Sequence, residues 1–187
     1  MRLSLTHHPG GAQATGPNSI AHDLEDGATL VWELGEDEPD GALLSAEVDL
    51  DPSTEWLMRC DRVDFGPGGI AYRHTHPGPG IRYLLFGSIT IDSEGEQHTY
   101  GPGEPWFERG PDPVLATTAP DEPSAFVRVM VLPVEYAGKR TITYVDPADA
   151  EKPKTQKATI FLEQGVSFAH AGDDVAERHP REVAEDS

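Results

Sequence analysis

The stretch that decides the fold is Gly68–Gly87, GGIAYRHTHPGPGIRYLLFG, near the middle of the 187-residue chain. His74 and His76 stand two residues apart in a segment, 70–76, that we predict to be a strand. Because successive side chains of a strand point to opposite faces, the two imidazoles are predicted to share one face. Imidazole is a ligand of zinc, iron, manganese, nickel and copper, so this pair is a candidate metal site.

The spacing around this pair resembles the first motif of the cupin superfamily, in which Gly, five residues and His-x-His precede a Glu and a closing Gly. Five residues separate Gly68 from His74, and Gly87 holds the place of the closing Gly. The match covers about 20 residues. The resemblance implies a small jelly-roll β-barrel that carries a metal or ligand site inside it.

Two ligand positions depart from the cupin pattern. The Glu of the first motif falls on Gly80. The second motif, counted from Gly103, places three non-matching residues at its Pro, Gly and His positions: Arg109, Pro111 and Val114. Two of the four ligands that the resemblance implies are therefore present, His74 and His76.

Glu108 is the residue that we predict to complete the site. If position 80 faces the barrel interior, strand alternation predicts that Arg82 faces it too, and a buried Arg needs an anionic partner. Two interpretations stay open. Glu108 joins the two histidines as a two-His-one-carboxylate set, which suits Fe(II) or another divalent ion. Alternatively, Glu108 pairs with Arg82 and leaves the histidines with water or with no metal.

Candidate catalytic residues follow from the same reasoning. The guanidinium of Arg82 suits a substrate carboxylate, although an internal ion pair would occupy it equally well. Tyr72 lies two residues before His74, so we expect it on the same face, where it donates a hydrogen bond to a ligand or lines the barrel. With Glu108, these residues form the predicted catalytic set.

Glycine and proline set the fold class. The chain has 19 Gly and 17 Pro, a content that interrupts long helices and favours short strands joined by turns. We predict an all-β fold with a single jelly-roll barrel. Its organisation is an N-terminal arm at 1–27, a cupin-like barrel at 28–145 with its motif core at about 56–133, and a C-terminal extension at 146–187. Within the extension we expect a short hairpin at 158–168 and a disordered end from residue 170.

Charge and cysteine content exclude several classes of protein. The chain has 14 Lys and Arg against 33 Asp and Glu, a net charge of −19. This balance argues against nucleic acid and against anionic membrane surfaces as partners. The single cysteine, Cys60, cannot form an internal disulfide and is expected to pack as a small apolar residue. With no signal peptide or spanning segment in the sequence, we expect a soluble, cytoplasmic protein.

The sequence supports two functional hypotheses. The first is a barrel that binds a small, anionic organic molecule and uses a divalent ion (Fe, Mn, Ni, Cu or Zn) in dioxygenase or isomerase/lyase chemistry. The alternative is a non-catalytic binding or sensor protein that has lost metal ligands. The cupin resemblance also implies a homodimer.

Overall fold

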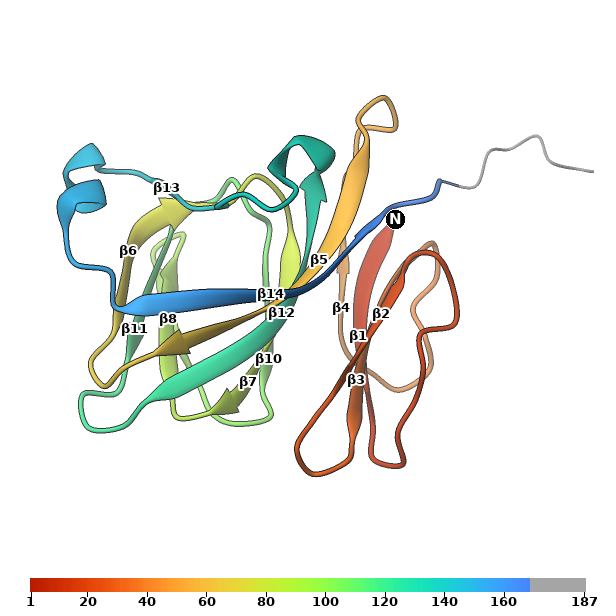
Figure 1. Ribbon diagram of the computed structural model, residues 1–187, viewed down its shortest axis with the longest axis horizontal. Coiled ribbons are helices and arrows are strands. Elements are labelled where there is room, and N and C mark those ends of the chain that lie inside the picture. The colour runs from red at the N-terminus through yellow and green to blue at the C-terminus, as the bar shows by residue number, and fades with distance from the viewer. Residues whose placement is uncertain (169–187) are drawn as a thin grey trace, which may run out of the picture.

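The computed structural model describes residues 1–168, which form three antiparallel sheets (Figure 1). The predicted disordered end from residue 170 lies outside this range. The strands are β1 Arg2–His8, β2 Ser19–Asp23, β3 Thr29–Gly35, β4 Ala42–Glu47, β5 Trp56–Phe65, β6 Ile70–Thr75, β7 Gly80–Phe86, β8 Ile89–Ser93, β9 Glu96–Tyr100, β10 Pro105–Glu108, β11 Val114–Thr118, β12 Ser124–Pro133, β13 Thr143–Tyr144 and β14 Gln156–Gly165. Two short 3₁₀ helices, η1 Val134–Tyr136 and η2 Pro147–Glu151, lie between β12 and β14.

Two five-stranded sheets face each other and form the barrel. Their strand orders are β10-β7-β12-β5-β14 and β13-β6-β11-β8-β9. A third sheet, β2-β3-β1-β4, packs against the outer face of the first. The prediction of an all-β, jelly-roll class is confirmed. No helix in the described part of the chain is long and apolar enough to cross a membrane.

Strand β12, the middle strand of the first barrel sheet, is buried on both faces, and its alternating side chains point into two separate cores. Along β12, Val127 and Val129 pack toward the third sheet, whereas Phe126 and Arg128 point into the barrel. The barrel core is apolar at one end, with Phe65, Trp106 and Phe126 among its buried residues. The polar side chains described below therefore sit inside an otherwise apolar layer.

The N-terminal 27 residues are not a loosely held arm, which corrects the prediction. Leu3 and Leu5 of β1 are fully buried and pair with Leu34 and Trp32 of β3. The Trp32 indole N–H donates to the backbone oxygen of Ile81 over 3.1 Å, which fixes this sheet to the barrel. Strands β3 and β4, which fall within the predicted barrel range 28–145, also belong to this third sheet and not to the barrel wall.

The C-terminal extension also differs from the prediction. Its β-structure is one strand, β14, which pairs along its whole length with β5, in place of a short hairpin. Thr155 reinforces this arrangement, because its hydroxyl accepts from and donates to the backbone of Ile70. The extension therefore completes one sheet of the barrel and contributes to its interior.

Candidate functional site

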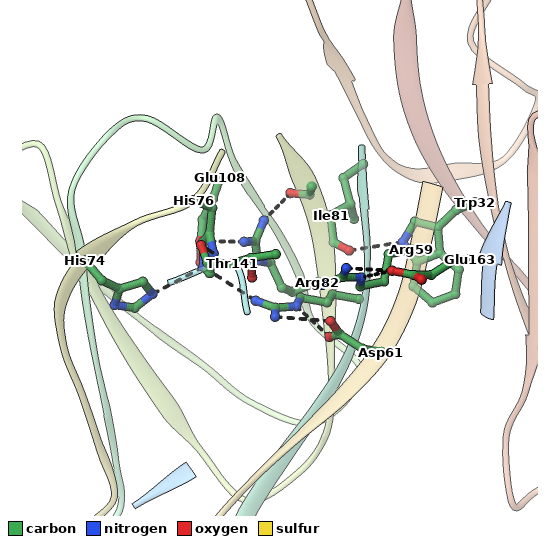
Figure 2. Close-up of polar contacts among 12 residues, drawn as sticks. Trp32, Arg59, Asp61, His74, His76, Ile81, Arg82, Glu108, Thr141 and Glu163 are labelled. Atoms are coloured by element: carbon green, nitrogen blue, oxygen red, sulfur yellow. Dashed lines mark hydrogen bonds and ion pairs between the residues drawn. The ribbon is translucent and has the colours of Figure 1, made fainter. Parts of the chain in front are cut away.

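A layer of polar side chains from several strands meets inside the barrel (Figure 2). His74 lies on β6 and His76 directly follows it, while Arg82 lies on β7 and Glu108 on β10. Both histidines are 4% exposed, and Arg82 is fully buried. The structure thus brings these four predicted residues together.

Each histidine is held by a backbone carbonyl. The Nδ1 of His74 lies 2.7 Å from the backbone oxygen of Tyr72, and the Nδ1 of His76 lies 3.1 Å from that of Thr141. A carbonyl oxygen only accepts hydrogen bonds, so each Nδ1 carries the proton. In the neutral ring, each Nε2 is then an unprotonated lone pair. The two Nε2 atoms face one another at 3.2 Å.

Burial keeps both rings neutral. Removal from water lowers the pKa of His74 and lowers that of His76 well below its ordinary value, and nearby Arg128 adds to both effects. Two neutral imidazoles whose lone pairs face each other repel unless a proton or a cation lies between them. The pair therefore presents two nitrogen atoms close enough to share one proton or to bind one cation.

Glu108 lies opposite Gly80 in the pairing of β10 with β7. Its Oε2 lies 2.7 Å from Nη2 of Arg82 and 3.9 Å from Nε2 of His76, and its Oε1 accepts from the Trp106 indole over 2.9 Å. Both carboxylate oxygens are thus engaged within the protein. Of the two interpretations of the sequence, this geometry shows the pairing of Glu108 with Arg82.

Gly80 gives Arg82 its space. A Cβ atom at position 80 would lie 2.7 Å from the backbone oxygen of Val129 and 3.0 Å from Nη1 of Arg82. That nitrogen donates to the backbone oxygen of Gly80 over 2.6 Å. Burial lowers the pKa of Arg82 to about 10, while Glu108 opposes that shift. A guanidinium therefore fills the space beside the position where the cupin motif has its Glu.

Sequence reasoning missed a second buried ion pair beside the first. The guanidinium of Arg128 donates to both oxygens of Asp61, over 2.6 and 3.2 Å, and its Nη1 lies 3.5 Å from Nε2 of His76. The signal was present: Arg128 interrupts the apolar run AFVRVMVLP, and Arg59 and Asp61 alternate with buried residues on β5. Charges with period two in a buried strand indicate a polar inner face.

Tyr72 does not face the site, which corrects the prediction. On β6, Ala71 and His74 pair with Ala116 and Val114, so three steps on one strand match two on the other. This β-bulge puts Ala71 and His74 on the same inner face and turns Tyr72 outward. Its ring is half-buried and lies 4.3 Å from the ammonium of Lys152.

The histidines line a small cavity of about 50 Å³. Its wall includes Glu108, Arg128 and Val114, so the position of the missing second-motif His does face the site. A cavity of this size has room for a few water molecules. It does not enclose a whole organic ligand, for which several hundred Å³ is usual.

The donor set of the histidine pair fits a divalent metal ion in two respects. Two imidazole nitrogens that bind the same zinc ion, each at about 2.1 Å, lie about 3.0–3.4 Å apart when the N–Zn–N angle is about 90–110°. The observed separation of 3.2 Å falls in that interval. Each ring also donates its Nδ1 proton to a carbonyl, as metal-bound histidines do. Within residues 1–168, however, no three His, Cys, Asp or Glu side chains form a metal-binding group, so the set His74, His76 and Glu108 stays a prediction.

Comparisons with known proteins give similarity in structure only. No protein-family model matches the chain, and no curated protein matches it. An RmlC-like cupin from Shewanella frigidimarina is 15% identical with a TM-score of 0.37, and the match covers 46% of this chain and 90% of that one. The polyketide cyclase RemF from Streptomyces resistomycificus is 22% identical with a TM-score of 0.37, covering 57% and 75%. A cupin 2 conserved barrel domain protein from Salinispora arenicola is 17% identical with a TM-score of 0.36, covering 44% and 69%. These similar structures include several named as cupins, the superfamily that the His-x-His motif resembles.

Proposed function

We propose that this chain is a cupin-like, small-molecule-binding protein whose barrel holds a divalent metal ion between His74 and His76. One observation carries the proposal: two buried, neutral imidazoles direct unprotonated Nε2 atoms at each other over 3.2 Å. Without a shared proton or a cation that arrangement is repulsive, and with a metal ion it supplies two ligands. Water or a bound molecule in the adjoining cavity would supply the others.

When bound, the ion would act as a Lewis acid that polarises an oxygen atom of the ligand. The protein's own groups have separate tasks. The carbonyls of Tyr72 and Thr141 hold the imidazoles in one tautomer. Glu108 neutralises Arg82, so the two buried ion pairs leave the surroundings of the histidines with no net charge. The apolar wall excludes bulk water. For this form we propose dioxygenase or isomerase/lyase chemistry.

A non-catalytic binding protein is the second candidate. The observation that favours it is the engagement of both Glu108 oxygens by Arg82 and Trp106, which leaves no third ligand beside the histidines among residues 1–168. A protein of this kind would bind its ligand without tight metal retention. Metal content therefore separates the two candidates.

The test is elemental mass spectrometry of protein purified without chelator, together with the thermal midpoint after chelation and re-addition of each ion. We expect near one equivalent of a divalent transition metal and a midpoint that rises when that ion is added back. The variant His74→Ala/His76→Ala should lose both, whereas His8→Ala/His98→Ala, which removes two imidazoles that do not line the cavity, should lose neither. Absence of metal together with no thermal response in the wild type would exclude the metal form.

A further inference from the structure

A basic cleft lies beside the histidine cavity, in a protein of net charge −19. It has a volume of about 320 Å³, and Arg128, Ile142, Gln156 and Ala158 form part of the wall of both spaces. Five of the 14 Lys and Arg residues line it, against one carboxylate, Asp61. These cations are Arg59, Arg128, Lys139, Arg140 and Lys154. Lys and Arg side chains are thus concentrated in a cleft next to the histidine cavity.

Three of these cations have no anionic partner in the part of the chain that the structure describes. Arg128 pairs with Asp61 and Arg59 with Glu163, but no carboxylate within residues 1–168 forms an ion pair with the others. Those three are Lys139, Arg140 and Lys154. All three residues are exposed, so their charges are available to an anion that enters the cleft.

Tyr144 holds two of these charges together. The guanidinium of Arg140 lies 5.2 Å from its ring centroid and donates to its hydroxyl over 2.8 Å, while the ammonium of Lys154 lies 4.5 Å from the same ring. Lys154 also donates to the backbone oxygens of Asp149 and Ala150 over 3.0 and 2.8 Å. The positions of both charges are therefore built by the fold.

Two other features of the wall indicate a ligand. The Oε1 atom of Gln156 is buried without a hydrogen-bond partner among the described residues, and it belongs to a side chain that lines both the cleft and the cavity. Ile142, Ala158 and Ile160 give the cleft an apolar floor. A ligand with a charged group, a hydrogen-bond donor and a short carbon skeleton would satisfy all of these groups.

A different cleft beside the histidine cavity has the reverse charge. A second cleft, about 350 Å³, shares Glu108, Trp106, Ile91 and Val114 with the cavity and is lined by four carboxylates and one arginine. The carboxylates are Glu94, Glu96, Glu108 and Asp112. An anion is therefore favoured on the basic side alone.

We propose that the basic cleft binds a small organic anion, a carboxylate or phosphate, through Lys139, Arg140 and Lys154, with its carbon skeleton against the apolar floor and directed at Gln156. The proposal rests on the proposed small-molecule-binding function, whose ligand class it names, but it does not require the metal ion. The cleft also reaches the histidine pair, because Thr141, in the same loop as Lys139 and Arg140, accepts the Nδ1 proton of His76.

The test uses isothermal titration of chelator-treated, full-length protein at low ionic strength, with inorganic phosphate, malate and the uncharged malamide as probes, because the hydroxyl of malate can donate to Gln156. We expect phosphate or malate to bind and malamide not to bind. Lys139→Gln/Arg140→Gln should weaken anion binding about tenfold, because two charge-assisted contacts are lost at a partly exposed site. The matched control Arg109→Gln/Lys157→Gln, which changes the net charge equally outside this cleft, should bind as the wild type does.

The outcomes separate this proposal from the metal proposal. Anion binding that persists in His74→Ala/His76→Ala, with unchanged metal content in Lys139→Gln/Arg140→Gln, supports two independent features. Metal binding without any anion binding would refute the proposed anion site in the cleft and leave the metal proposal intact. If the control variant Arg109→Gln/Lys157→Gln weakened anion binding equally, the proposed anion site would also be refuted, since net charge alone would then explain the binding.

Discussion

Replacing Glu108 by Gln removes the anionic partner of Arg82 with almost no change in shape. The pair is 1% and 9% exposed, with a closest N···O distance of 2.7 Å. Two unit charges about 4 Å apart interact by about 4 kcal/mol at an effective dielectric constant of about 20. Breaking a buried pair from one side costs about 3–5 kcal/mol, because it leaves a charge without compensation. We therefore expect Glu108→Gln to lower the free energy of unfolding by about 3–4 kcal/mol.

The assay is urea unfolding followed by tryptophan fluorescence near neutral pH with chelator present. The double variant Arg82→Met/Glu108→Gln removes both charges and should be clearly more stable than Glu108→Gln, with a coupling energy of about 2 kcal/mol or more. The control Glu94→Gln breaks an exposed pair with Arg109 and should cost no more than about 1 kcal/mol. A loss below about 1 kcal/mol in Glu108→Gln, or single losses that simply add in the double variant, would refute the reasoning.

Three further predictions concern the barrel. Burial lowers the pKa of His74 and His76 below 6.5, so the metal-free unfolded chain takes up protons first as the pH falls. The free energy of unfolding should therefore drop below about pH 6.5, by up to about 1.4 kcal/mol per pH unit for each ring. Urea titrations that show no drop relative to a His74→Gln/His76→Gln variant would contradict this. Burial raises the pKa of Cys60 to about 12, so a thiol reagent should modify it only as fast as the protein unfolds, and rapid labelling of the native protein would be the contrary result. Gly80→Ala should destabilise the fold by roughly 1–3 kcal/mol, because its Cβ meets a backbone oxygen at 2.7 Å; unchanged urea unfolding would show that the strand yields freely.

The local part of the site could be predicted from sequence because it depends on spacing within one strand. Alternation places His74 and His76 together, and the motif count places Val114 against the same cavity. Tyr72 shows the limit of this reasoning. A single β-bulge shifts the alternation by one residue, and the sequence of β6 contains no glycine or proline that indicates it.

The non-local parts could not be predicted in the same way. Arg128 and Asp61 are 67 residues apart in sequence, and only the pairing of β12 with β5 brings them together. The third sheet was missed for a different reason. The burial of Leu3 and Leu5 depends on contact with the outer face of the barrel, whereas the Gly- and Pro-rich composition of 9–17 indicates a loop. Tertiary packing therefore overrode local composition there.

The most direct test of the central claim, that the paired imidazoles hold a metal ion, is the X-ray absorption spectrum of the zinc-loaded protein. We predict two imidazole ligands with Zn–N distances of about 2.0–2.1 Å, the remaining ligands being light atoms from water or a bound anion. His74→Ala/His76→Ala, loaded identically, should lose the imidazole scattering. A wild-type spectrum without imidazole scattering would contradict the claim.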